Sequence, residues 1–460
     1  MKVLKFGGSV LKNANDVKNV CNILKTSFSD YHPECLKNSK RQIVAVFSAF
    51  YKMTDKLILL GQKASKRENY KDDFEDFKHF HYKIIEDLKI DKSCVDDIFV
   101  KLEHLLLKIY DNERIIDEIF DLLMSFGERA SLIIIFNYLG KTEDVNYVLS
   151  YEMIKTNDNF GNAKVNFEES GELINGCFEN IDSDFVVCSG FIGSDNNGKI
   201  TTLGRNGSDY SASIFSNILK ANVLEIWKDT DGLLTADPKI VKNAKFIDMI
   251  GYQEMAEMSS LGNKVIHIKA ITPCITEKIP ILLKNCYNPT ARGTLISQES
   301  SNKYLVNGVV KLDNVVVITI SFNEYIDMND CCIKIQSIIG KFESDIITIS
   351  QNVKQRVINL VITDAKEKKF TSEIKNIFKN EIKESDISIS SSITKSMITV
   401  VGSCIINAIG FASRIFTIIQ QNNINIDYIH DDFSKTRISF LCSVDESDNV
   451  VRLLHNDIVL

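Results

Sequence analysis

Short apolar runs alternate with longer helical patterns through the first two thirds of the chain. The runs at 3–6, 42–48, 185–191 and 223–227 are mostly hydrophobic, as expected for strands buried on both faces of a sheet. The stretch 54–139 instead repeats apolar residues at spacings of three and four, which is typical of amphipathic helices. Strands that alternate with helices predict an α/β fold, in which helices cover both faces of a parallel or mixed sheet.

A polar segment at 297–303 separates this part from a tail with a different pattern. In the tail, the order strand, helix, strand, strand, helix, strand occurs twice, over 304–390 and over 391–460. This order predicts two ferredoxin-like βαββαβ modules. We therefore expect three domains, with bounds at 1–298, 304–390 and 391–460, as suits a chain of 460 residues.

Composition excludes several classes of partner. The net charge is −7 and the basic residues are scattered, which argues against binding to nucleic acid or to an anionic membrane. The N-terminus lacks the pattern of a signal peptide, and no apolar run is long enough to span a membrane. The 11 cysteines contain no CxxC pair, so we expect reduced thiols, a cytoplasmic location and no dedicated metal site.

The segment 5–9 (KFGGS) joins a strand to a helix through two glycines. Such a turn exposes backbone N–H groups and the positive end of a helix dipole, with Lys5 beside them. Gly7 and Gly8 would let a phosphate approach the backbone closely. The segment is a candidate anion site, and a purely structural turn is the alternative.

Residues 193–199 (GSDNNGK) have the spacing of a P-loop. However, Ile200 stands where that motif needs a magnesium-binding Ser or Thr. The residues that follow read as a strand and not as a helix, and DNNG is a typical hairpin sequence. We interpret this segment as a turn between two strands.

Two further loops carry charged residues. In the loop 201–210 (TTLGRNGSDY), Arg205 could grip a carboxylate with two parallel hydrogen bonds. The alternative is that Ser208 or Asp209 only caps the following helix. The loop 227–239 is dense in turn residues, and its lysines and aspartates could flank a nucleotide or could simply be solvated.

Two other charged residues interrupt helical patterns. Glu128 follows Gly127 in an otherwise apolar helical stretch. It could bind a cationic group, or it could be an ordinary charge on a helix surface. Lys264 follows Gly262 at the expected start of a helix.

Together these motifs resemble the aspartate kinases of the amino-acid kinase superfamily. The resemblance runs through almost the whole chain in one order, and it rests on KFGGS at 5–9, VFSA at 46–49 with TDKL at 54–57, SFGERAS at 125–131, FIG at 191–193, TTLGRNGSDYSA at 201–212, the segment 227–238, AEM at 256–258 and GNKVIH at 262–267. It implies an αβα-sandwich kinase domain over 1–298.

The resemblance also implies roles for individual residues. It assigns catalysis to Lys5, Asp209 and Lys264. It assigns L-aspartate binding to Ser48, Thr54, Glu128, Arg205 and Ser208, with Arg205 on a carboxylate and Glu128 on the ammonium group. It assigns ATP binding to Lys5, Gly7, Gly8, Ser9, Lys228, Asp229, Leu234, Lys239 and Lys264.

The implied reaction is transfer of the γ-phosphoryl group of ATP to the β-carboxylate of L-aspartate. That carboxylate is ionised at neutral pH, so no general base is needed. Catalysis then consists of aligning two anions and neutralising charge. Mg²⁺ would be carried by the nucleotide, mainly on phosphate oxygens and water.

Five positions depart from the family pattern. Asn206 stands where the family has glycine, Lys228 where it has a small hydroxyl residue, and Lys239 where it has arginine. Leu234 replaces a tyrosine, and Ile268 replaces a proline. These departures concern ATP affinity more than the reaction.

The tail resembles paired ACT modules, the small domains that sense amino acids. The second copy matches better, at 410–416 and 423–426, whereas the equivalent turn of the first copy, 324–330, lacks the glycine. We expect feedback control by lysine or, second, threonine, assembly as a homodimer or larger oligomer through these modules, and no dehydrogenase domain after them. The alternatives are a tail that only dimerises, a kinase acting on glutamate or acetylglutamate, and an inactive sensor.

Overall fold

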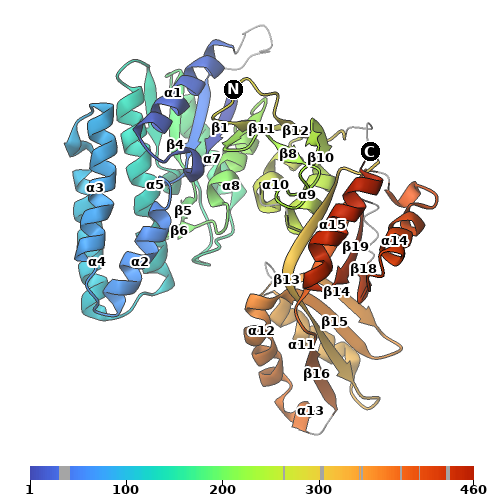
Figure 1. The fold of residues 1–460 in the computed structure, drawn as a ribbon. Helices are drawn as coiled ribbons and strands as arrows, with labels where there is room; N and C mark the ends of the chain where they lie inside the picture. The colour runs from blue at the N-terminus through green and yellow to red at the C-terminus, as the bar shows by residue number, and fades with distance from the viewer. Residues whose placement is uncertain are drawn as a thin grey trace. The chain divides into compact units, whose positions relative to one another are not determined.

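The structure, a computed structural model, describes residues 1–30, 42–262, 265–300, 305–340, 342, 346–383, 386–403, 405–430 and 436–459 (Figure 1). These residues form two compact units. The first contains Met1–Leu233, Ile247–Tyr252 and Ile266–Ser300, and the second contains Leu234–Phe246, Gln253–Val265 and Ser301–Leu460. The domain bounds expected from the sequence remain a prediction.

An eight-stranded mixed sheet forms the centre of the first unit. Its neighbouring strands all run parallel except for one antiparallel pair, β11 with β12. The strand order is β10 (Met249–Gly251), β12 (Thr294–Ser297), β11 (Ile281–Asn285), β7 (Leu224–Lys228), β1 (Lys2–Phe6), β2 (Ile43–Phe47), β4 (Phe185–Ser189) and β3 (Val145–Val148). The apolar runs expected to be strands are confirmed as the central strands.

Helices cover both faces of this sheet, so the expected αβα sandwich is confirmed (Figure 1). One face carries α1 (Ala14–Ser29) and α5 (Asp117–Leu139), with α2 (Met53–Ser65), α3 (Lys71–Leu88), η3 (Lys92–Val95) and α4 (Asp96–Asn112) in a helical layer beyond them. The other face carries α8 (Gly207–Ile218), against which α7 (Phe167–Glu179) and α10 (Ile268–Thr276) pack.

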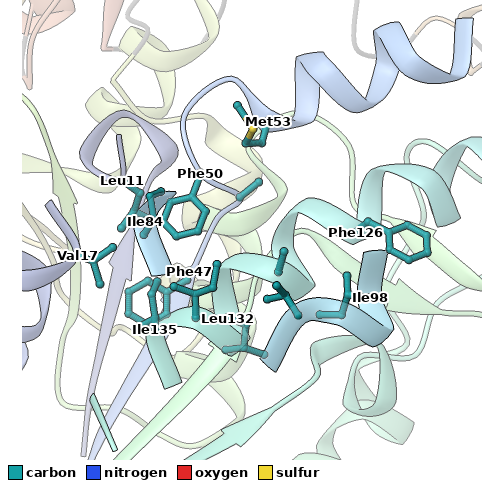
Figure 2. Packing of buried hydrophobic residues seen from close by; sticks show 14 of the residues in the cluster. Leu11, Val17, Phe47, Phe50, Met53, Ile84, Ile98, Phe126, Leu132 and Ile135 are labelled. Carbon is teal, nitrogen blue, oxygen red and sulfur yellow. The ribbon is translucent and has the colours of Figure 1, made fainter. Parts of the chain in front are cut away.

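The core of the first unit lies between the sheet and the α1–α5 layer. Figure 2 shows Phe47, Phe50, Leu132 and Ile135 within this cluster. Each buried side chain of this size contributes about 1.5–3 kcal/mol. The apolar spacing in α3 is confirmed, because its buried residues are Phe74, Phe77, His81, Ile84, Ile85 and Leu88.

The segment with P-loop spacing is a hairpin, as expected. It joins β5 (Ile192–Ser194) to the antiparallel β6 (Ile200–Thr202). In the turn, the Asp195 side chain accepts hydrogen bonds from the backbone of Asn197 and Lys199, and Gly198 has a φ of +77°. The first unit also contains η1 (Gly8–Val10) and α6 (Ser150–Met153).

The second unit contains two modules that share the strand β13 (Gly308–Phe322). The first has the expected order βαββαβ, but among the described residues of 391–460 the order is βαββα, because the helix α15 is the last element. The second half of β13 pairs with β15 and β16, whereas its first half pairs with β17. The first half of β13 thus supplies the fourth strand of the second module. The elements are β13, α11 (Met328–Ile339), β14 (Ile346–Asn352), β15 (Val357–Thr363), α12 (Asp364–Ile377), α13 (Lys379–Lys383), β16 (Ile387–Ser391), β17 (Lys395–Val401), η4 (Ile405–Asn407), α14 (Phe411–Gln421), β18 (Tyr428–His430), β19 (Arg437–Cys442) and α15 (Val444–Ile458).

One helix of the tail begins earlier than its apolar pattern predicts. The buried apolar residues of α12 begin only at Phe370, but the helix itself begins at Asp364 and is followed by α13. Asp364 and Glu367 lie in the first turn, where acidic side chains interact favourably with the helix dipole. The helix therefore starts on polar residues that an apolar pattern does not include.

The segment Leu234–Phe246 belongs to the core of the second unit. Ala236 and Val241 lie in one apolar cluster with Ile415 and Leu454. The short strands β8 (Leu233–Leu234) and β9 (Phe246–Ile247) flank this segment, and α9 (Tyr252–Ser260) follows. Among the described residues, no helix is both long and apolar enough to cross a membrane, and the nine described cysteines are free.

Candidate active site

A cavity of about 750 Å³ lies at the carboxyl ends of β1, β2 and β7. Ligands of open parallel sheets bind at this edge, because the loops that follow the strands converge there. Of the residues predicted from the sequence, the cavity is lined by Lys5, Gly7, Gly8, Ser9, Ser48, Thr54, Glu128, Arg205, Ser208, Asp209 and Lys228. The structure therefore brings residues from six separate segments to one place.

Two lysines and one aspartate form a buried charged cluster in this cavity. The carboxylate of Asp209 on α8 pairs with the ammonium groups of Lys5 on β1 and of Lys228 on β7, the latter at 3.3 Å. Burial alone would raise the pKa of Asp209, but the positive charges of Lys228 and Lys5 lower it to about 2. Burial lowers the pKa of Lys5, and the charge of Asp209 opposes that effect. The two cations exceed the anion by one charge, which suits an anionic ligand.

Two glycines, Gly7 and Gly8, line the cavity after Lys5. A Cβ atom on Gly7 would lie 3.2 Å from the Lys5 Nζ, and one on Gly8 would lie 3.0 Å from the carbonyl oxygen of Ala49. The helical turn η1 follows directly, held by backbone hydrogen bonds to the Gly7 and Gly8 carbonyls. Ser9 Oγ donates a hydrogen bond to Asp229 at 3.5 Å. The absence of side chains leaves the backbone open to a ligand beside a lysine.

Glu128 on α5 is a buried carboxyl group with one free oxygen. Its side chain is 3% exposed. Oε1 accepts a hydrogen bond from the Ala49 N–H at 3.4 Å, and Oε2 has no hydrogen-bond partner among the described residues. Burial raises the pKa of Glu128 to about 8, although the Ala49 hydrogen bond and the Lys5 charge act in the opposite direction. The alternative of a surface charge is therefore wrong.

Arg205 lies in a tight loop between β6 and α8. Gly204 and Asn206 on either side of it have positive φ values of +78° and +56°. Arg205 itself is exposed, and it lines the cavity. The helix α8 begins at Gly207 with Asn206 as its N-cap and no side-chain capping hydrogen bond. The alternative in which Ser208 or Asp209 only caps this helix is therefore wrong.

Three described residues of the predicted site, Leu234, Lys239 and Asp229, do not line the cavity. Leu234 and Lys239 belong to the second compact unit. Lys264 lies outside the described residues. Asp229 does not line the cavity, but it touches it through Ser9.

Sequence reasoning missed several lining residues. Phe120 and Met124 precede Glu128 by eight and four positions on α5 and share its face. That helical spacing was a usable signal. Lys52, which has a φ of +62°, and Phe191, with +71°, carried no such signal, because backbone conformations of this kind are rare for these residue types.

Comparison with known proteins extends over the whole chain. The sequence model of the amino acid kinase family matches residues 1–285, and an ACT domain model matches residues 398–458. The bifunctional aspartokinase/homoserine dehydrogenase of Haemophilus influenzae is 28% identical over 99% of this chain, which corresponds to 56% of that protein. The chain thus spans little more than half the length of this relative.

Two solved structures share the fold over the full length of both chains. The aspartate kinase of Clostridium acetobutylicum is 27% identical, with a TM-score of 0.76. Aspartokinase III of Escherichia coli, in complex with aspartate and ADP, is 22% identical, with a TM-score of 0.84. The second likeness concerns the fold alone.

Proposed function

The chain belongs to the amino acid kinase family, and we propose that it is an aspartate kinase, which transfers the γ-phosphoryl group of ATP to the β-carboxylate of L-aspartate. One observation carries this proposal. The same cavity holds a buried carboxyl group with a free oxygen, an arginine in a tight loop, and a lysine–aspartate–lysine cluster beside two glycines. The first two suit an amino acid, and the third suits phosphate groups.

We assign the amino-acid end of the cavity to Glu128 and Arg205. The free Oε2 of Glu128 would accept a hydrogen bond from the substrate ammonium group, which supplies the partner that this buried atom lacks. The guanidinium of Arg205 would bind a carboxylate through two parallel hydrogen bonds. Ser48, Thr54 and Ser208 also line the cavity, and their hydroxyl groups can donate to the second carboxylate.

We assign the phosphate end to Lys5, Gly7, Gly8, Ser9 and Lys228. The glycine-lined turn and the two ammonium groups fit a polyphosphate, because both supply donors without steric obstruction. Mg²⁺ bound to the nucleotide would add charge neutralisation at the phosphate oxygens. We further propose nucleotide contacts for Asp229, Leu234, Lys239 and Lys264.

In this arrangement Asp209 is a positioning residue. It holds Lys5 and Lys228 by ion pairs and, with a pKa of about 2, stays ionised at neutral pH. The two lysines can then stabilise the charge that develops as the phosphoryl group leaves ADP for the carboxylate oxygen. The attacking carboxylate is already ionised, so proton removal is not required.

The test is an ATP- and Mg²⁺-dependent assay that traps the acyl phosphate as its hydroxamate. L-Aspartate, L-glutamate and acetylglutamate are compared, with Lys5→Ala and Arg205→Ala as site variants. Lys199→Met serves as the control, because it removes an exposed ion pair with Glu118 outside the cavity. Turnover confined to aspartate and lost in both site variants is expected. Folded protein that phosphorylates none of the three would favour an inactive sensor.

We also propose that the tail binds an amino-acid effector, lysine first and threonine second, and that the chain assembles as a homodimer or larger oligomer through its ACT modules. The family-level support is the ACT match at 398–458. A second structure of the Escherichia coli enzyme contains lysine and aspartate. An unchanged rate at saturating lysine and threonine, alone and together, would refute feedback control, and a monomer in sedimentation velocity would refute assembly.

A further inference from the structure

We propose that Asp121 on α5 and Lys269 on α10 are positioning residues that hold the Arg205 loop and thereby set the affinity for the amino-acid substrate. This inference rests on the proposed function, since it concerns how the cavity binds L-aspartate. Neither residue lines the cavity. Both act on backbone segments that do.

Asp121 is fully buried. It accepts three hydrogen bonds from two segments, one at Gly161 and one at Thr202, which leads into the Arg205 loop. Its Oδ2 accepts from the N–H of Thr202 at 2.7 Å and from that of Gly161 at 2.9 Å. Its Oδ1 accepts from Thr202 Oγ1 at 2.9 Å. Thr202 and Gly161 both line the cavity. A buried carboxylate whose oxygens bind two chain segments fixes the distance between them.

Lys269 binds the same two segments from a second helix, α10. Its ammonium group donates to the carbonyl oxygen of Leu203 at 2.8 Å and to Asn162 Oδ1 at 2.7 Å. It also lies 5.2 Å from the centre of the Tyr210 ring on α8. Asn162 in turn fills the space next to Gly204, where a Cβ would come within 2.6 Å of its Oδ1. Asp121 and Lys269 therefore contact adjoining residues from two different helices.

The position of Arg205 depends on the residues that Asp121 and Lys269 hold, because no ion pair fixes its own side chain among the described residues. Arg205 is also exposed. Only Leu203 and Gly204 separate it from Thr202. A shift of the Thr202 end would therefore move the guanidinium directly. A misplacement of this kind weakens substrate binding without touching Lys5 or Asp209.

The spacing on α5 links both ends of the amino-acid site. Asp121 precedes Glu128 by seven residues, which is two helical turns and a rise of about 10 Å along one face. One helix thus positions the ammonium-binding carboxyl group directly and the carboxylate-binding arginine through Thr202. This gives α5 a role in setting the separation between the two groups.

The test combines steady-state kinetics with amide hydrogen exchange on the full chain. In Asp121→Ala the buried N–H group of Thr202 and the N–H group of Gly161 lose their acceptor, so the KM for L-aspartate should rise about tenfold. The kcat should change little because the lysine cluster is intact. Lys269→Met should raise the same KM. Exchange in peptides covering 159–164 and 200–206 should accelerate in both variants.

Two variants separate positioning from general stability. Asp121→Asn can remake all three bonds, with its amide oxygen accepting from both N–H groups and its NH₂ donating to Thr202 Oγ1, so KM should return to within about threefold. Lys199→Met removes an exposed ion pair between Glu118 on α5 and the hairpin of β5 and β6. This variant should leave the KM for L-aspartate and the amide exchange unchanged.

The outcomes distinguish this inference from the proposed function. If the unmodified chain turns over aspartate but Asp121→Ala and Lys269→Met keep its KM, the positioning role is wrong and the function stands. If the unmodified chain turns over no substrate, the function is wrong. In that case, unchanged exchange at 200–206 in both variants would also refute the proposal that Asp121 and Lys269 hold the Arg205 loop.

Discussion

Lowering the pH from about 8 to about 6 should weaken the binding of L-aspartate about 50-fold through Glu128. Its pKa of about 8 results from burial, and only the ionised form can pair with a substrate ammonium group. The ionised fraction falls from about one half to about one hundredth over this range. The apparent dissociation constant is the intrinsic value divided by the ionised fraction, so it rises about 50-fold between about pH 8 and about pH 6.

Isothermal titration without nucleotide measures this effect directly. Repeating the titration at about pH 7 in buffers of different ionisation enthalpy should reveal release of about 0.9 proton per aspartate bound, because Glu128 must ionise. His267 does not account for the trend. Burial and the nearby Arg205 lower its pKa, and its protonation at acid pH would favour an anionic ligand.

Glu128→Gln provides the control. This variant keeps the shape of the side chain but cannot titrate, so its weaker binding should be independent of pH between about 6 and 8. A dissociation constant of the unmodified chain that varies less than about threefold over this range, or an equal slope in Glu128→Gln, would refute the role of Glu128 as the ammonium partner.

The raised pKa of Glu128 also affects stability, and here a lower pH is favourable, whereas it weakens the binding of aspartate. A carboxyl group whose pKa is higher in the folded than in the unfolded chain favours folding below its unfolded value of 4.5, and this contribution is lost as the pH rises through about 8. Glu128→Gln should therefore unfold at a higher temperature than the unmodified chain at about pH 8, and the difference should shrink toward about pH 5.

Three further changes have definite expected outcomes. Lys5→Met should lower kcat in the hydroxamate assay about 10²- to 10³-fold, because it removes one cation from the transferring phosphoryl group; thermal unfolding checks that the variant is folded. Burial among Phe50, Phe77 and Phe99 lowers the pKa of His81 to about 4. Because the unfolded chain binds this proton more readily, the contribution of His81 should make the free energy of unfolding about 2 kcal/mol lower at about pH 5 than at about pH 7. His81→Leu should lose that difference in urea titrations. Gly190→Ala should destabilise the fold by ~1–3 kcal/mol in the same titrations, because the new Cβ would lie 2.6 Å from the Ser208 Cβ.

The layers of the first unit could be predicted from the sequence because their signals are periodic. Continuous apolar runs became the central strands, and the spacing of three and four became the buried face of α3. The second unit was harder. A single strand, β13, serves two modules, and its apolar pattern is the same whether it has one set of partners or two. The packing of Ala236 and Val241 with Ile415 depends on contacts between segments far apart in sequence, which local patterns do not encode.

The candidate site was predictable where chemistry and turn residues coincide. Lys5, Arg205 and Asp209 stand within two positions of glycines that mark loops, and all three line the cavity. Asp121 was not predicted, because a lone aspartate in a helical stretch has no distinguishing neighbour in the sequence. Its function as an acceptor for Thr202 and Gly161 exists only once β6 has folded against α5.

The two ends that we propose for the cavity are supported by different elements, so we expect that they can be altered separately. The phosphate end rests on the sheet strands β1 and β7, where Lys5 and Lys228 are held by Asp209. The amino-acid end rests on α5, which carries Glu128 and, two turns earlier, Asp121. Strands fixed by hydrogen bonds on both sides do not move when one helix side chain is shortened. Shortening Asp121 should therefore act on the KM for aspartate and leave the KM for ATP nearly constant, because its three hydrogen bonds go to Thr202 and Gly161 and not to β1 or β7.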